Sequence, residues 1–513
     1  MHFLALDFDY RLLALFCIAT LSFLLWHRFR VVHDPREPPF AASRVPYVGH
    51  LLGFLTNGLA YFQLLHSQNQ LPAFTINILS LKGYVLNTPE LAAAVHRNAK
   101  TLSFYPIVSF AVKGMAGLDK ESMALINDYV HTEKGSRSFL DELHDIHNST
   151  LVSGAFFDSL RDDSVRNLAT CIRETQMPFQ TSVFAWVRHL FTISTTDAVW
   201  GPGNPLRDPA LEADFWTYEG GISGMALDFY PGIFVPKGLA ARERLYKSFL
   251  QYNLNKGHAE ASQFIKERSA IALKHGRNIE YVARGDTSIG FGIMVNLYKA
   301  AGWAPLYVFP RPTLVAELRA EITSAVTRTS NQATISVTTL RRTCPLLTAT
   351  LYETIRHAGS VSTTRWVCED TLLAERYLVK KGGFVRVPAA SIHGDPAVWG
   401  SDVDEFNPHR FLKRSSAGKL ELRVPASAFQ GFGGGSTYCP GRNLAVSTIS
   451  VFMLMMVMGY EVAPKGGKEW VLPERDSRNE GVALPKRDVE VVIKEREGWE
   501  GVKWVFEGGK SVE

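Results

Sequence analysis

Apolar residues gather into two long runs near the two ends of the chain. The first extends from residue 12 to residue 26, with only Thr20 and Ser22 as polar members, and the second extends from residue 444 to residue 458. Between them, leucine and tyrosine recur in residues 346–352 at the spacing of one helix face. The pattern along the rest of the chain is also helical for the most part. These patterns predict a mainly helical protein.

The N-terminal run predicts a membrane anchor. It is shorter than the ~20 residues that a spanning helix needs, although flanking aromatic and arginine side chains can extend it. A cleaved signal peptide, the competing interpretation, requires a basic start and a small-residue cleavage site, whereas two aspartates precede this run. Two arginines after the run against one before it favour a cytoplasmic C-terminal body. We therefore expect residues 1–30 to form a signal anchor.

Prolines follow the anchor and predict a stiff linker over residues 31–50, because proline cannot continue a helix. No internal repeat or low-complexity tract stands out in residues 51–513. The linker prolines are Pro35, Pro38, Pro39 and Pro46.

Composition excludes several classes of protein. The 513 residues are 46% hydrophobic and 20% charged, and a dispersed net charge of +5 gives no reason to expect nucleic-acid binding. The cysteines are odd in number and lack CxxC spacing, which disfavours a disulfide framework and a zinc site. They fit a compartment where thiols stay reduced. The five are Cys17, Cys171, Cys344, Cys368 and Cys439.

The loop before the C-terminal apolar run carries the clearest chemical pattern. It reads Phe-Gly-Gly-Gly-Ser-Thr-Tyr-Cys-Pro-Gly-Arg from Phe432, with Cys439 just before the predicted helix. The N-terminus of a helix lowers the pKa of a nearby thiol and favours the anion that ligates metal. Gly435 and Gly441 would let the backbone approach a large flat ligand, and Phe432 could shield the sulfur from water. The alternative is a buried structural cysteine near a glycine turn.

The pattern Phe-x-x-Gly-x-x-x-Cys-x-Gly resembles the haem loop of the cytochrome P450 family, and two further motifs strengthen the resemblance. Glu353 and Arg356 stand three apart on a predicted helix, where they can pair, although such pairs are commonly a solvated face. The segment from Phe406 to Phe411 is similar to the meander motif of the family. In the family, its arginine, here Arg410, completes a buried Glu-Arg-Arg network that maintains the fold and retains haem.

The resemblance covers nearly everything after residue 40 and implies that residues 51–513 form one haem-thiolate catalytic domain. It implies a mainly α fold with a small β-rich region and a haem b cofactor with an axial thiolate. It implies Cys439 as the iron ligand, with Phe432, Gly435 and Gly441 around the haem. Arg365 lies where the family commonly has a haem-propionate partner; an ordinary exposed strand arginine is the alternative. Thr437 departs from the pattern, because many members carry Arg or His there.

The helix that crosses the distal face of the haem also departs from the common family pattern. Residues 290–309 occupy its place, with Val295 and Asn296 where an acid and a threonine are usual. Asn296 precedes Trp303 by seven positions, as in the branch that contains sterol 7α-hydroxylases and prostacyclin synthase. The resemblance implies a distal catalytic role for Asn296; the alternative is a buried polar residue with a backbone partner. Pro305 should kink the helix or end it early.

The implied function is that of a single-pass, endoplasmic reticulum monooxygenase with a cytosolic catalytic domain. It would use O2 and electrons from NADPH–cytochrome P450 reductase to oxidise an apolar small molecule, such as a terpenoid, sterol, polyketide or alkaloid. The resemblance to filamentous-fungal members implies a tailoring step in specialised metabolism. A reductase-independent isomerase is the alternative enzyme. A non-catalytic haem sensor fits poorly, because a sensor needs neither the electron push of a thiolate nor residues 216–250, which in the family cap the substrate pocket.

Overall fold

The computed structural model describes residues 15–17, 19–20, 33–43, 45, 48–78, 81–130, 136–478 and 480–507. The predicted anchor over residues 1–30 lies outside this part of the chain except for the first two short pieces, so it stays a prediction. Within the linker, Pro46 also lies outside the described residues.

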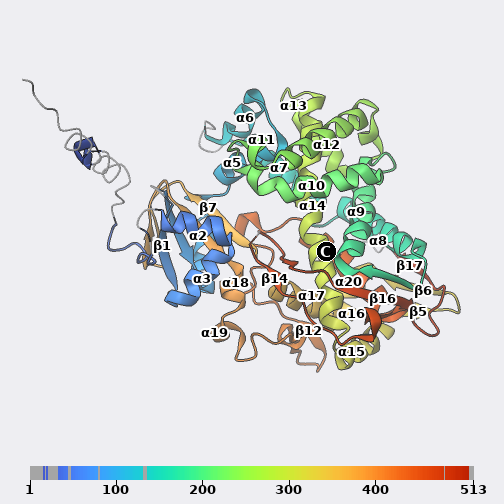
Figure 1. Cartoon of the computed structure of the whole chain (residues 1–513). Coiled ribbons are helices and arrows are strands. Elements are labelled where there is room, and N and C mark those ends of the chain that lie inside the picture. Colours follow the sequence, from blue (N-terminus) through green and yellow to red (C-terminus); the bar gives the residue numbers. More distant parts are fainter. Residues whose placement is uncertain are drawn as a thin grey trace, which may run out of the picture.

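Helices make up most of the described chain, which confirms the predicted mainly helical fold (Figure 1). The longest, α14, runs through the middle of the molecule in Figure 1 and packs against α9, α12, α17 and α20. The helices are α2 Gly49–Asn57, α3 Ala60–Asn69, α4 Pro89–Arg97, α5 Tyr105–Ala116, α6 Lys120–Ile126, α7 Phe139–Leu151, α8 Ala155–Glu174, α9 Val183–Trp200, α10 Pro209–Ala226, α11 Pro231–Phe234, α12 Pro236–Leu254, α13 Gln263–Lys274, α14 Ile279–Val308, α15 Pro312–Thr323, α16 Val337–Thr343, α17 Pro345–Ala358, α18 Ala389–His393, α19 Pro396–Trp399 and α20 Arg442–Gly459.

Short strands form small sheets beside the helices. The largest sheet has the order β1-β2-β10-β7-β3 and lies next to α2 and α3 (Figure 1). Its strands are β1 Ala73–Ile78, β2 Leu81–Leu86, β10 Phe384–Pro388, β7 Ser362–Val367 and β3 Leu102–Ser103. Two three-stranded sheets contain β13 Tyr460–Pro464, β16 Glu490–Glu495 and β4 Phe179–Ser182, and β17 Lys503–Glu507, β6 Gln332–Ser336 and β5 Val326–Arg328. Three strand pairs are β8 Thr371–Leu373 with β9 Tyr377–Val379, β11 Leu412–Arg414 with β12 Leu420–Leu422, and β14 Arg475–Asp476 with β15 Leu484–Pro485.

The central helix α14 begins at a side-chain cap and ends near a proline. Asn278 accepts a hydrogen bond from the backbone N–H of Tyr281 at 3.0 Å, which satisfies one of the free donors of the first turn. Pro305 lies inside the last turns, and the helix ends three residues later at Val308. The long helix therefore starts before the predicted residue 290 and brings Asn296 to its middle.

The C-terminal apolar run forms α20, which lies in the main hydrophobic core. Within the described residues, it is the one helix long and apolar enough to cross a membrane, but 78% of that stretch is buried inside the molecule. Helices that are apolar on all faces belong to the core of a large protein or to a membrane. Its burial against α14 and α17 identifies α20 as a core helix.

Candidate functional site

The Cys439 loop ends at the start of α20 and faces α14 across a cavity. The Cys439 N–H donates to the Phe432 carbonyl oxygen at 3.0 Å, which closes the loop. Cys439, Phe432 and Gly441 line a cavity of about 660 Å³, and Ile293 and Asn296 of α14 line it too. The thiol therefore faces a mostly apolar chamber that is large enough for a flat ligand.

The environment of the thiol acts on its pKa in two directions. Burial raises the pKa of Cys439, while the backbone N–H groups of Gly441 and Arg442 and the charge of Arg442 lower it. Burial is the largest effect, so the net direction is opposite to that expected from the helix N-terminus alone. A ligated metal requires the thiolate, and metal binding releases the proton. The donor set around Cys439 thus fits a sulfur that becomes anionic on binding a metal cation.

The glycines of the loop have different surroundings. Gly441 lines the cavity, and a Cβ there would lie 3.9 Å from the Cys439 sulfur. Gly435 is not among the residues that line it: its φ is +64°, and a Cβ there would lie 3.0 Å from the Cβ of His96. Gly433, with φ of +72°, also lines the cavity, although the sequence pattern did not single it out as a binding residue. The glycine at 435 therefore serves the turn and the packing against α4.

Arg365 is a buried cation on the cavity wall. Its side chain donates to the Thr364 carbonyl oxygen at 2.9 Å and to the Thr437 hydroxyl. The residue is 4% exposed, and no carboxylate among the described residues pairs with it. Burial lowers its pKa to about 10. A buried charge requires a partner, so this guanidinium fits a ligand that brings an anionic group such as a haem propionate.

Glu353, Arg356 and Arg410 form the buried ion network that their motifs predict. Glu353 is fully buried and accepts from Arg356 Nε at 2.7 Å and from Arg410 Nε at 2.9 Å. The Asn407 N–H donates to the same carboxylate at 2.9 Å, and His357 Nε2 lies 3.3 Å from it. Because Asn407 precedes the predicted meander arginine, the carboxylate ties α17 to that segment. These contacts exclude the alternative of a solvated helix face.

Asn296 and Trp303 hold one segment of the β14–β15 loop against α14. The Asn296 side-chain oxygen accepts from the Val482 N–H at 2.8 Å, and Trp303 Nε1 donates to the Ala483 carbonyl oxygen at 2.7 Å. Residues seven apart lie on one face of a helix, so both side chains reach the same segment. Asn296 therefore has the backbone partner of the alternative interpretation and also lines the cavity. Its catalytic role stays a prediction.

Two charged residues on the cavity wall were missed in the sequence. Arg386 of β10 and Glu480 of the β14–β15 loop both line the cavity and pair at 2.5 Å. They are 94 positions apart in the chain, and neither belongs to a recognisable motif. Only the fold brings them together.

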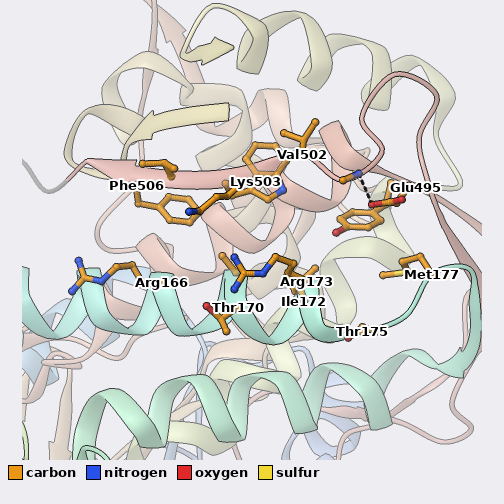
Figure 2. Close-up of a pocket in the computed structure, with 15 residues that line it drawn as sticks. Arg166, Thr170, Ile172, Arg173, Thr175, Met177, Glu495, Val502, Lys503 and Phe506 are labelled. Atoms are coloured by element: carbon orange, nitrogen blue, oxygen red, sulfur yellow. Dashed lines mark hydrogen bonds between the residues drawn. The ribbon is translucent and has the colours of Figure 1, made fainter. Parts of the chain in front are cut away.

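A second hollow lies between α8 and β17 and has a different character (Figure 2). Its volume is about 370 Å³, and it has no lining residue in common with the Cys439 cavity. Figure 2 shows Arg166 and Arg173 on the helix and Lys503 on the strand, with Glu495 engaged by the Gly501 N–H at 3.0 Å. This groove contains no cysteine and does not contribute to the site around Cys439.

Comparison with known proteins agrees with this geometry. The family model for cytochrome P450 matches residues 300–492, which include the Glu353 network and the Cys439 loop, while Asn296 lies before them. The cytochrome P450 monooxygenase nodJ of Hypoxylon pulicicidum is 29% identical over 95% of this chain and 96% of the relative. A cytochrome P450 monooxygenase of Gibberella zeae is 28% identical over 96% of each chain. Cytochrome P450 7B1 of Mus musculus is 26% identical over 88% of this chain and 90% of the relative.

Proposed function

We propose, from the premise that this chain belongs to the cytochrome P450 family and is a haem-thiolate monooxygenase, that it oxidises an apolar small molecule in specialised metabolism. The single observation that carries the proposal is the cavity between the Cys439 loop and α14, with Cys439 on one wall and mostly apolar side chains around it. The fungal monooxygenases among the relatives support a tailoring reaction. A terpenoid, sterol, polyketide or alkaloid would each suit an apolar chamber.

The residues that would hold haem b lie on two elements of the cavity wall, the Cys439 loop and β7. Cys439 would supply the axial thiolate, Phe432 and Gly441 would lie beside it, and Arg365 would pair with a propionate. Bound haem with a thiolate ligand supplies oxygen activation, because the thiolate pushes electron density onto the iron and favours O–O cleavage. The Glu353 network would retain the haem indirectly, by fixing α17 against the segment before the loop.

Asn296 is the residue on the α14 side of the cavity that would take part in proton delivery. Its side-chain oxygen is occupied by the Val482 N–H, which leaves the amide nitrogen as donor. An amide N–H can hold a water in place at little net cost in free energy. We propose that Asn296 orders a water that delivers protons, since Val295 beside it cannot carry one.

An exposed apolar surface supports association with a membrane. Five residues between α10 and α12 have more than half of their surface exposed, and the Phe229 and Phe234 rings stack at 5.7 Å. Contiguous apolar patches of this kind mark interaction surfaces. We propose that these residues contact the endoplasmic reticulum membrane together with the anchor. We also propose that NADPH–cytochrome P450 reductase delivers electrons to the enzyme at this membrane. The residues are Leu227, Phe229, Tyr230, Ile233 and Phe234.

Product analysis under isotopically labelled dioxygen tests the proposal. Cells that express the chain with a reductase should accumulate a product that carries one labelled oxygen atom and is absent from cells that express Cys439→Ser. Product formation by purified enzyme should require both NADPH and reductase. Turnover without reductase, to a product without the label, would instead identify a rearrangement enzyme.

A further inference from the structure

The cavity around Cys439 is mostly apolar, and apart from Arg365 its charged side chains meet at one corner. Arg386 on β10 and Glu480 in the β14–β15 loop form this corner, next to Ser362 and Thr364 of β7. We propose that the Glu480 carboxylate accepts a hydrogen bond from a neutral donor, an O–H or N–H group, on an otherwise apolar substrate. This inference rests on the proposed function and names the polar feature of its substrate.

The carboxylate is held in place by two bonds and keeps capacity for a third. Glu480 accepts from Arg386 Nη2 at 2.5 Å and from the Ser362 N–H at 2.5 Å, one bond to each oxygen. An ionised carboxylate has about four lone-pair sites, and 47% of this side chain remains exposed. Free acceptor sites therefore remain on a group that borders the cavity.

Arg386 orients Glu480 and is itself fixed. It is 8% exposed, donates to the Thr364 hydroxyl at 3.1 Å and lies 4.9 Å from the centroid of the Phe62 ring. Buried in this way, it offsets the charge of Glu480 without offering much surface to a ligand. In the haem-loaded enzyme, where Arg365 would pair with a propionate, a substrate carboxylate at this corner would meet Glu480 and be repelled, whereas a neutral donor would be attracted.

The loop that carries Glu480 is anchored on both sides. Asn296 holds Val482 from α14, and the Gly481 carbonyl oxygen accepts from the Ser360 N–H at 2.6 Å. Gly481 has φ of +99°, and a Cβ there would lie 2.2 Å from the Asn296 side-chain oxygen, so only glycine fits the turn. A group held in its bound position loses little freedom on binding. The Glu480 carboxylate is therefore already in position to accept a hydrogen bond from a substrate.

Displacement of water by the substrate makes the preference for a donor strong. When an apolar substrate displaces water from the corner, the free lone pairs of Glu480 lose their partners. A donor on the substrate restores them, and leaving a charged acceptor unsatisfied is costly. A purely structural ion pair would instead show no preference among ligands that reach it.

Matched imidazole probes test the proposal in the haem-loaded enzyme. We would use 1-alkylimidazoles of increasing chain length that end in a hydroxyl, a methoxy or a carboxylate group, because imidazole ligates haem iron and shifts its absorption spectrum. At one chain length, the hydroxyl probe should bind about ten-fold more tightly than the methoxy probe in the wild type. The carboxylate probe should bind more weakly than either.

Two substitutions of Glu480 and one control complete the test. Glu480→Leu should remove the hydroxyl preference and favour the carboxylate probe, since Arg386 is then unpaired, and Glu480→Gln should weaken the discrimination against the carboxylate. Glu474→Gln breaks the exposed pair with Lys486 outside the cavity and should leave every ratio unchanged. Equal affinities for hydroxyl and methoxy probes at all chain lengths, unchanged ratios in both Glu480 variants, or no spectral response to any probe would overturn the proposal. Failure of the monooxygenase function is separate, because it appears as absent reductase-dependent turnover with intact probe binding.

Discussion

Replacing Glu353 by glutamine tests the buried ion network most sharply. The substitution keeps the shape of the side chain but removes the negative charge between Arg356 and Arg410, whose side chains are 2% and 8% exposed. Breaking a buried ion pair by removing one partner costs about 3–5 kcal/mol. Native proteins are stable by only about 5–15 kcal/mol, so Glu353→Gln should lose a large share of the free energy of unfolding.

The assay combines denaturant unfolding with haem content. We expect a lower unfolding midpoint and a smaller fraction of haem-loaded protein in Glu353→Gln. The matched control is Asp402→Asn, because Asp402 pairs with Arg410 from a side chain that is 39% exposed, and such pairs contribute about 0–1 kcal/mol. A variant Glu353→Gln as stable and as haem-rich as Asp402→Asn would refute the reasoning.

The same network predicts a dependence of stability on pH. Burial by itself raises the pKa of Glu353, but hydrogen bonds from Arg356 and His357 outweigh it and lower the pKa from 4.5 to about 2. A depressed folded pKa means that the stabilisation is complete above the unfolded pKa and is lost as the pH falls from about 4.5 towards 2. Glu353→Gln should lack this part of the acid-induced loss of stability.

Two further predictions concern the distal wall and the membrane. Asn296→Leu should lower product formation more than NADPH consumption, and the excess electrons should appear as hydrogen peroxide or water. The control Trp303→Phe loosens the same loop from outside the cavity and should keep the ratio of product formed to NADPH consumed. An equal ratio in the two variants would show that Asn296 does not deliver protons. Deleting residues 1–30 should release part of the protein from membranes with its haem spectrum intact. Adding Phe229→Ser and Ile233→Ser to this deletion should release the rest. Full membrane retention of the combined variant would contradict the proposed role of the apolar surface, and a cleaved N-terminus on the wild-type protein would contradict the proposed anchor.

The parts of the site that could be predicted from sequence are those fixed by local geometry. Glu353 and Arg356 are three apart on one helix, and Cys439 lies three residues before the start of α20; such short motifs can be matched to those of a known family. The partners of Asn296 could not be found this way, because the Val482 N–H lies 186 residues away and backbone groups leave no mark in sequence. The same holds for Glu480 and Arg386, which meet only because a loop folds over β7 and β10.

Burial explains the remaining differences between sequence and structure. The helix N-terminus at Cys439 acts on the thiol as predicted, but desolvation outweighs it, and the depth of a side chain is not visible from a loop motif. Gly435 illustrates the same limit: its positive φ and its contact with His96 explain the glycine without a ligand. A glycine pattern indicates that another group approaches the backbone closely, but only the fold shows whether that group is a ligand or a neighbouring side chain.

The ferrous–carbon monoxide spectrum of the purified enzyme tests the central claim, that Cys439 supplies the thiolate of a haem monooxygenase, most directly. The wild type should show the strongly red-shifted Soret band of thiolate-ligated haem. Cys439→Ser should lose that band, because no other cysteine lines the cavity in the described part of the chain. A red-shifted band retained in Cys439→Ser, or absent from haem-loaded wild type, would contradict the account.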